Sequence, residues 1–276
     1  MIALEFISSR ANPRFKMLKA LSRRRVRERE GIYIAEGFHL AGEALRAGAF
    51  IEGLYVSPRG EGRPEGKALL AEAQARRLKV FGLTDELLDE LSEVEGPYGM
   101  LVVARLAYAD LDQLLGELPA DGLLVVADGL QDPGNLGTII RTAHAAGAAG
   151  LICAPETVDP FNGKTLRAAM GSHFHLPLAR AAAERIGPAL RAAGVRLLAA
   201  DPHAGRDVWR TDLRGRVALL VGSEGAGPRR QLRHAADLRV CIPMPGGAES
   251  LNAAVAAAIV LYEAVRQRHY GGPPAE

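Results

Sequence analysis

Short apolar runs alternate with helix-like stretches through the first part of the chain. The apolar runs predict strands at residues 32–35, 54–56, 79–81 and 100–103. The stretches between them predict helices at about 37–48, 66–77 and 85–92. This alternation is typical of a small α/β unit. From Ala107 to Gly122 the strand pattern disappears and turn-forming residues gather, so the sequence predicts a domain junction there.

The alternation is clearer beyond this junction. Nearly unbroken apolar runs occupy residues 123–127, 151–153, 195–200, 217–221 and 238–242. Strands that are apolar at successive positions are covered on both faces, as in a parallel sheet flanked by helices. We therefore predict an N-terminal α/β domain over 1–107, a linker over 108–118 and a second α/β domain over 119–276.

Composition places the chain among ordinary globular proteins. It has 276 residues, of which 48% are hydrophobic and 24% charged, and this length accommodates two medium-sized domains. No run approaches the ~18 apolar residues of a membrane helix, and Glu5 interrupts the apolar start, so we expect a cytoplasmic protein. Cys153 and Cys241 each lie in an apolar run, which favours small buried side chains over a disulfide or a metal site.

Basic residues are concentrated near the N-terminus. The formal net charge is +2, but residues 1–30 contain nine Lys or Arg and three Glu. A helix is predicted over 13–29, because Asn12-Pro13 is a typical start and Phe15, Leu18 and Leu21 recur at a spacing of three. A local basic surface can bind a polyanion or can simply be solvated, and both interpretations stay open; a membrane surface fits less well. The candidate RNA-binding residues are Arg10, Arg14, Lys16, Arg23, Arg24 and Arg25.

Polar, glycine-rich segments follow three of the predicted strands in the second domain. They cover residues 128–141, 222–227 and 243–252. In an open parallel sheet, ligands bind at the carboxyl ends of the strands. Glycine lets the backbone approach a ligand closely, so the three segments predict one pocket with many backbone contacts.

Familiar nucleotide and hydrolase motifs are absent. Gly163-Lys164-Thr165 lacks the first glycine of a phosphate loop, since Val158 stands five residues before Gly163. The glycines of 134–137 and 222–227 do not have the spacing of a dinucleotide fold, and no Gly-x-Ser-x-Gly elbow occurs. His173 and His175 have no nearby acid, so no metal site is predicted.

Each polar residue of the three segments also has a purely structural interpretation. Asn135, Glu224 and Ser250 are each placed to cap a following helix, and Arg141 can form a surface ion pair. Their occurrence together, on three strand ends, favours a functional site.

The three segments, in this order, resemble the motifs of the SpoU (TrmH) family of RNA ribose 2'-O-methyltransferases. The matching stretches are residues 135–143, 220–225 and 242–258. Residues 8–56, including Ser9 and Glu36-Gly37, are similar to the substrate-binding domain of a branch that contains 23S ribosomal RNA methyltransferases. The resemblance covers nearly the whole chain. One departure is Ala253, where many relatives have valine.

The resemblance implies a SPOUT-type parallel sheet with a deep trefoil knot, a homodimer, and S-adenosylmethionine bound by the knotted loops without a metal. The implied cofactor-binding residues are Leu220, Gly222, Ile242, Met244 and Leu251. The implied catalytic residues are Arg141, Asn135, Glu224, Ser250 and Asn252.

Ribose methylation requires in-line alignment and removal of the 2'-hydroxyl proton. By analogy Arg141 is the proton acceptor, but a guanidinium has no acceptor while it is protonated. Two roles therefore stay open: a transiently neutral base helped by an RNA phosphate, or a cation that clamps the phosphate and stabilises the developing alkoxide. We expect 23S ribosomal RNA as the substrate. Transfer RNA, and a non-catalytic RNA-binding protein on the same scaffold, are the alternatives.

Overall fold

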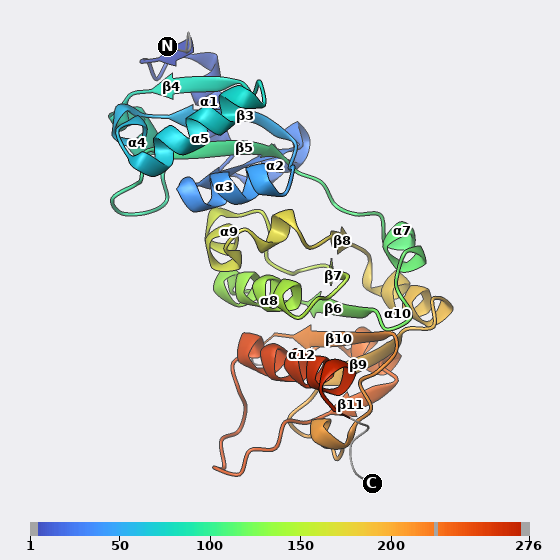
Figure 1. Cartoon of the computed structure of the whole chain (residues 1–276). Coiled ribbons are helices and arrows are strands. Elements are labelled where there is room, and N and C mark those ends of the chain that lie inside the picture. Colours follow the sequence, from blue (N-terminus) through green and yellow to red (C-terminus); the bar gives the residue numbers. More distant parts are fainter. Residues whose placement is uncertain (1–4, 224–225, 272–276) are drawn as a thin grey trace. The chain divides into compact units, whose positions relative to one another are not determined.

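The computed structural model describes residues 5–223 and 226–271. This part of the chain divides into two compact units (Figure 1). One unit runs up to Ala107 and includes Phe161–Phe174, and the other comprises Tyr108–Pro160 and the chain from His175 onward. None of the described helices has both the length and the apolar character needed to cross a bilayer.

The first unit is built on a mixed sheet with the order β1-β4-β3-β5-β2. Parallel pairs join β4 to β1 and β3, and antiparallel pairs join β5 to β3 and β2. The strands are β1 (Glu5–Ile7), β2 (Ile32–Glu36), β3 (Ile51–Val56), β4 (Val80–Leu83) and β5 (Met100–Arg105). The helices are α1 (Pro13–Ala20), α2 (Arg24–Glu30), α3 (Phe38–Arg46), α4 (Pro58–Glu61), α5 (Pro64–Ala75), α6 (Asp85–Leu91) and α9 (Gly163–Ala169), followed by the 3-10 turn η1 (Ser172–Phe174).

The prediction of one basic helix over 13–29 is wrong, because the segment forms the two helices α1 and α2. Arg23, between them, has extended backbone angles (φ −91°, ψ 125°). The buried Arg27 side chain donates hydrogen bonds to the carbonyls of Leu21 and Ser22, at 2.7 and 2.8 Å. These carbonyls lie at the end of α1 and lack helical partners, so the guanidinium stabilises the break.

The second unit is built on the predicted parallel sheet, in the order β11-β9-β10-β6-β7-β8, with parallel pairing throughout. The strands are β6 (Leu123–Asp128), β7 (Gly150–Cys153), β8 (Leu178–Arg180), β9 (Arg196–Ala200), β10 (Val217–Gly222) and β11 (Leu238–Val240). The helices are α7 (Leu111–Gly116), α8 (Pro133–Ala145), α10 (Ala183–Ala192), α11 (Arg230–Ala235) and α12 (Ala253–His269), with the 3-10 turn η2 (Val208–Arg210). The α/β fold class is confirmed.

Helix α7 occupies most of the segment predicted to be a linker. Asp110 caps it by accepting hydrogen bonds from the backbone N–H groups of Asp112 and Gln113. Its leucines recur at helical spacing and are buried in the same core as the sheet residues Leu124 and Leu220. The segment therefore contributes to the core of the second unit.

Helix α12 is anchored by polar side chains that are buried. Gln267, 2% exposed, accepts a hydrogen bond from Leu213 N–H and donates to Thr211 O and to the Glu263 carboxylate. Glu263 also accepts two hydrogen bonds from Arg266, both of 2.8 Å. The Arg266 guanidinium holds the pKa of Glu263 below its usual range. The network fixes the C-terminal end of α12.

Candidate active site

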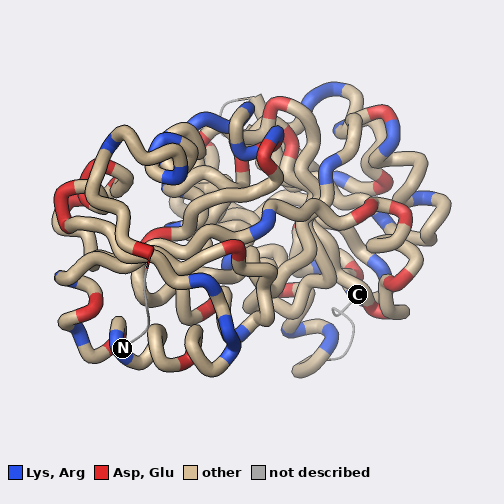
Figure 2. Tube along the Cα trace, turned by 90° about the horizontal axis from the view of Figure 1, so that it is seen from above, with Lys and Arg blue, Asp and Glu red and all other residues tan. Residues whose placement is uncertain are grey.

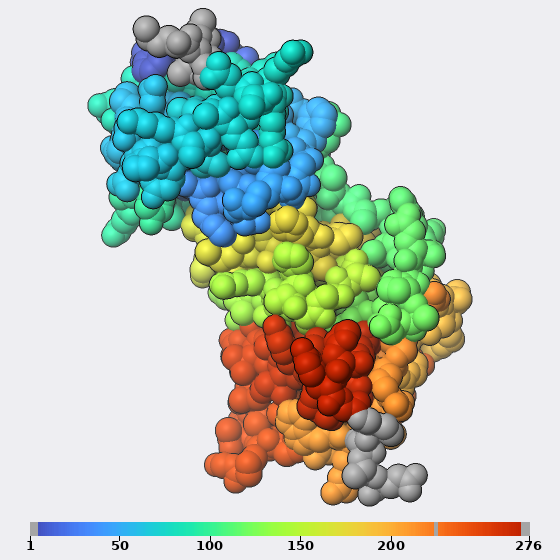
Figure 3. All heavy atoms as spheres, in the orientation of Figure 1, coloured from blue at the N-terminus to red at the C-terminus, as the bar shows by residue number. Residues whose placement is uncertain are grey.

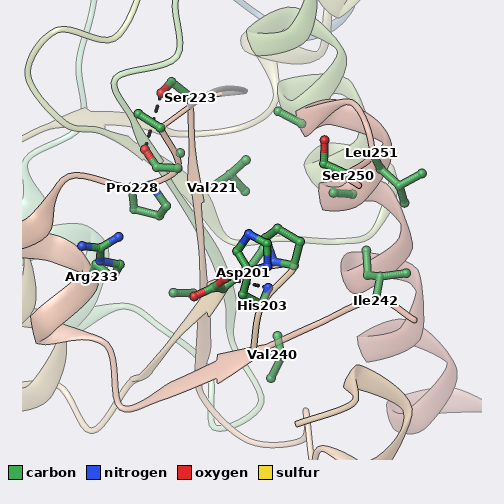
Figure 4. Close-up of a pocket in the computed structure, with 18 of the residues that line it drawn as sticks. Asp201, His203, Val221, Ser223, Pro228, Arg233, Val240, Ile242, Ser250 and Leu251 are labelled. Carbon is green, nitrogen blue, oxygen red and sulfur yellow. Dashed lines mark hydrogen bonds between the residues drawn. The ribbon is translucent and has the colours of Figure 1, made fainter. Parts of the chain in front are cut away.

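A cavity of about 220 Å³ lies at the carboxyl ends of β9, β10 and β11 (Figure 4). Parallel strands place these ends at one edge of the sheet, so segments distant in sequence meet there. One wall is the loop that follows β10, with Ser223 and Pro228. The facing wall is the loop before α12, and Val240 lies at the base.

The loop after β10 folds tightly back over Gly222. A Cβ atom on Gly222 would lie 2.0 Å from the backbone nitrogen of Pro228 and 2.1 Å from the carbonyl carbon of Gly227. A hydrogen bond of 2.9 Å from Gly227 N–H to Ser223 O closes the turn, and Gly227 has a positive φ of 66°. Only glycine at 222 permits this approach, so the backbone itself forms this wall of the cavity.

The facing wall is mainly apolar. Ile242, Met244, Leu251, Ala253 and Ala256 line it. Ser250 is also at the surface of the cavity (Figure 4). Four residues singled out from the sequence as cofactor-binding, Gly222, Ile242, Met244 and Leu251, thus border one space.

The structure joins the first and third sequence motifs through two asparagines. Asn252 Nδ2 donates a hydrogen bond of 3.0 Å to Asn135 Oδ1. Asn252 is also the N-cap of α12, since its Oδ1 accepts hydrogen bonds from the N–H groups of Ala254 and Val255. One side chain therefore fixes the start of α12 and the link to α8 at once.

Two structural interpretations made from the sequence are wrong. Asn252, and not Ser250, caps α12. Asp132, and not Asn135, caps α8, because its carboxylate accepts a 2.7 Å hydrogen bond from Asn135 N–H. Proline at the first position of α8 moves the start of the helix back to residue 133, which puts Asn135 inside the first turn. The Asn135 side chain is thereby directed to Asn252 instead of its own helix end.

Four of the proposed site residues do not line this cavity: Arg141, Leu220, Asn135 and Asn252. Arg141 lies on α8 and is exposed, and it forms no hydrogen bond or ion pair with the described residues. Leu220 is fully buried within β10, where its backbone is paired with both β6 and β9. Glu224 lies outside the described residues.

Sequence reasoning missed the loop after β9, which supplies Asp201, Pro202 and His203 to the cavity. The Asp201 carboxylate accepts a 2.9 Å hydrogen bond from His203 N–H and lies 3.4 Å from Arg239 Nη1. The signal was available, because β9 was predicted and its carboxyl end falls at the same edge of the sheet.

A buried ion pair lies beneath the loop after β10. Asp128, at the end of β6, has no exposed surface. Its two carboxylate oxygens accept hydrogen bonds of 2.7 Å from Arg229 N–H and from Arg229 Nε. A buried carboxylate requires such a partner, so this pair fixes the segment that leads into α11.

Metal-binding groups do not assemble anywhere in the described part of the chain. It contains no group of three or more His, Cys, Asp or Glu that could hold an ion. Cys153 is buried and Cys241 is half-buried, and neither forms a disulfide within the described residues.

Some basic residues near the N-terminus already contact other side chains of the protein, and others do not. Arg10 and Lys19 both contact Glu90, whose pKa they lower. Arg14 lies over the Phe81 ring at 4.1 Å, and Arg24 pairs with Glu28. The exposed Lys16, Arg23 and Arg25 form no ion pair with the described residues. Acidic positions accompany the basic ones along the whole trace (Figure 2).

Comparison with known proteins identifies the family. Residues 122–262, which contain the whole cavity, match the SpoU rRNA Methylase family. The chain belongs to the SpoU rRNA methylase family. Residues 12–102 match the MRM3-like substrate binding domain.

Individual SpoU relatives match along almost the whole chain. A Bacillus subtilis protein named 23S rRNA (guanosine(2553)-2'-O)-methyltransferase RlmP is 33% identical over 93% of this chain and 97% of its own. A Streptomyces viridochromogenes protein named 23S rRNA (uridine(2479)-2'-O)-methyltransferase is 37% identical over 96% of this chain and 93% of its own. The crystal structure of an AdoMet-bound rRNA methyltransferase from Sinorhizobium meliloti superimposes with a TM-score of 0.85 at 35% identity, covering 98% of this chain and 99% of that one.

Proposed function

We propose that this SpoU protein transfers a methyl group from S-adenosylmethionine to the 2'-oxygen of a ribose in 23S ribosomal RNA, in the cytoplasm. The observation that carries the proposal is the cavity whose walls come from the second and third family motifs, tied to the first motif by the Asn252–Asn135 hydrogen bond. Relatives that match over nearly the whole chain are named for this reaction on 23S rRNA.

The cavity suits an adenosine-containing cofactor. Apolar side chains of Ile242 and Leu251 offer a surface for a purine ring, and the Gly222 backbone is open to close approach because a Cβ is absent. Met244 and the Asp201 loop complete the rim. When bound, S-adenosylmethionine supplies an electrophilic methyl group on a sulfonium. We assign to Leu220 a supporting role: it belongs to the core beneath the cavity and does not contact the cofactor.

The side chains at the site orient the ribose and stabilise charge. Asn135 and Asn252 are joined by a hydrogen bond between their side chains, and Ser250 borders the cavity with a hydroxyl group. We assign to Arg141 the role of a cation that holds an RNA phosphate and stabilises the alkoxide that develops as the 2'-hydroxyl loses its proton. The exposed, unengaged guanidinium supports this role, since deprotonating arginine is much more costly. Glu224 remains a proposed orienting residue.

We further propose that the chain is a homodimer and that its second unit carries the family's trefoil knot. The surface of α12 supports the dimer. Val255 and Tyr262, seven residues apart, are 48% and 51% exposed, and Ile259 is half-buried between them. Part of α12, dark red in Figure 3, lies at the surface of the second unit. A stripe at helical spacing that the unit itself does not cover suits contact with a second copy.

The function is tested by transfer of labelled methyl from S-adenosylmethionine to purified RNA, with ribosomal and transfer RNA fractions assayed separately. The expected result is label in 23S RNA, at one linkage that becomes resistant to alkali, and its loss in Arg141→Ala. Label in transfer RNA alone would overturn the substrate assignment. A protein that binds the cofactor but labels neither RNA fraction, and that also fails to label ribosomal assembly intermediates, would favour the non-catalytic alternative.

A further inference from the structure

A second hollow lies beside the candidate active site. This open groove of about 430 Å³ is bordered by the ends of β6 and β7 and by the start of α11. It shares Ser223, Gly227, Pro228 and Arg233 with the cofactor cavity. Since β10 lies between β9 and β6 in the sheet, the loop after β10 separates the two spaces.

Three arginines, Arg229, Arg230 and Arg233, border this groove. Arg229 is already neutralised, because it makes the buried pair with Asp128. The other acid at the groove, Glu156, is 74% exposed and lies 3.8 Å from Arg229 Nη1. Among the described residues, both acids of the groove therefore contact Arg229, which forms part of the wall.

Arg230 and Arg233 are different. Both are exposed, and neither side chain forms a hydrogen bond or an ion pair within the described ranges 5–223 and 226–271. They lie three residues apart on α11, and neighbours at this spacing share one face of a helix. The groove thus carries two guanidinium groups that no described residue pairs with, beside the cavity for the methyl donor.

We propose that Arg230 and Arg233 bind a phosphate of the RNA backbone close to the ribose that is methylated. A guanidinium presents paired N–H donors that match phosphate oxygens, and two of them on one helix face hold the strand in register. The inference rests on the proposed function, to which it adds an RNA contact on the catalytic unit. Arg233, which borders both spaces, links this contact to the cavity.

The shape of the groove favours RNA over the methionine carboxylate of the cofactor. The groove is open and lined largely by charged and polar residues with glycines, whereas the cavity on the other side of the loop is mainly apolar. An extended, anionic backbone fits an open groove, and a small cofactor fits the apolar cavity. The Asp128–Arg229 ion pair forms part of the groove wall without adding net charge.

The test compares Arg230→Glu and Arg233→Glu with Arg191→Glu. Arg191 is an exposed arginine in the last turn of α10, which leads into the amino end of β9 and so to the opposite edge of the sheet. Binding of purified 23S RNA is measured by filter retention across a salt series, and binding of S-adenosylmethionine by calorimetry. Arg229 is left unchanged, because its removal would strand the buried Asp128 carboxylate.

We expect each α11 variant to weaken RNA binding by about 10- to 100-fold at low salt, the range for one charge-assisted contact. The slope of log affinity against log salt should fall by about 1 per variant. Cofactor affinity should stay unchanged in Arg230→Glu, because Arg230 borders the groove and not the cofactor cavity. Arg191→Glu should behave as wild type in both assays. Unchanged RNA affinity in both α11 variants, or an equal loss in Arg191→Glu, would overturn the proposal.

A loss of cofactor affinity in Arg233→Glu, with RNA binding intact, would also overturn the proposal, because it would assign Arg233 to the cofactor site. The binding assay does not depend on turnover. If the wild type binds 23S RNA through α11 but methylates none of it, the proposed function fails while the α11 contact stands.

Discussion

A single side chain, Asn252, connects the helix cap, the interloop contact and the proposed chemistry. Its Oδ1 caps α12 and its Nδ2 donates to Asn135. Asn252→Asp keeps the cap acceptor and loses the donor, so we expect stability within about 0.5 kcal/mol of wild type but strongly reduced methyl transfer. Asn252→Ala should lose activity and also about 1–2 kcal/mol of stability. Urea unfolding and single-turnover methylation separate the two effects; full activity in Asn252→Asp would refute the role of the amide donor.

Gly222 tests whether the cavity holds the cofactor. A methyl group at this position would meet the Pro228 nitrogen and the Gly227 carbonyl, which are backbone atoms and cannot rotate away. Gly222→Ala should therefore displace the loop, cost about 1–3 kcal/mol of stability and abolish measurable S-adenosylmethionine binding. Gly116→Ala is the matched control, because no atom lies within 4 Å of its added Cβ. Calorimetric titration that shows normal cofactor affinity in Gly222→Ala would contradict the assignment.

At the level of single residues, the sequence identified the members of the site better than their contacts. Gly222, Ile242 and Leu251 do border one cavity. Local pattern predicted a pocket at the strand ends, whereas these three residues were named from the resemblance to the SpoU family. The Asn252–Asn135 bond joins residues 117 positions apart, and no local pattern encodes it. The same limit applies to caps, since Asp132 and Asn135 are both acceptable cap residues and only the helix start decides between them.

Helix α12 depends on polar groups that a hydrophobic pattern does not reveal. The pattern predicts a C-terminal helix, but it does not predict that Gln267 and Glu263 are buried within it. Likewise the break between α1 and α2 is fixed by the folded-back Arg27 side chain, which the spacing of Phe15, Leu18 and Leu21 does not register. Apolar spacing thus predicts the helices themselves. It does not predict a helix break or a buried polar contact that depends on one particular side chain.

The ion pair on α12 makes a specific pH prediction. The lowered pKa of Glu263 means that ionised Glu263 favours the folded state at pH above its unfolded value of about 4.3. That contribution is lost as pH falls through the lower folded-state pKa. Wild type should thus exceed Glu263→Gln in unfolding free energy at pH 7, with the difference shrinking on acidification below pH ~4. A difference that is constant between pH 7 and pH 3 would show that the carboxylate charge is not involved.

The exposed stripe of α12 determines the expected assembly of the whole molecule. Tyr262 is half-exposed at one end of the stripe, so Tyr262→Glu would place a charge in any two-fold contact there. We expect wild type to sediment as a dimer and Tyr262→Glu as a folded monomer with unchanged far-UV circular dichroism. His269→Glu, at the exposed end of the same helix, serves as the control. A monomeric wild type, or a dimeric Tyr262→Glu protein, would contradict the proposed interface.

The excess positive charge of the molecule is concentrated near its N-terminus. Residues 1–30 carry a net charge of +6 while the whole chain carries +2, so the remainder is acidic by about 4 charges. We therefore expect the remainder to bind RNA only where arginines gather locally. Within residues 1–30, Arg23 and Arg25 are exposed without ion pairs among the described residues, whereas Arg24 is paired with Glu28.

This difference in ion pairing predicts the order in which substitutions of the three adjacent arginines weaken RNA binding. Arg23→Ala and Arg25→Ala should each weaken binding of 23S RNA and reduce its salt slope by about 1, because each removes a cation that is available to a phosphate. Arg24→Ala should have the smaller effect, since its charge is already offset by Glu28. S-adenosylmethionine affinity should be the same in all three variants, because the cofactor cavity lies wholly in the second unit. Salt-series binding of the three variants checks the order, and equal losses at all three positions would show that ion pairing in the free protein does not decide which arginines contact RNA.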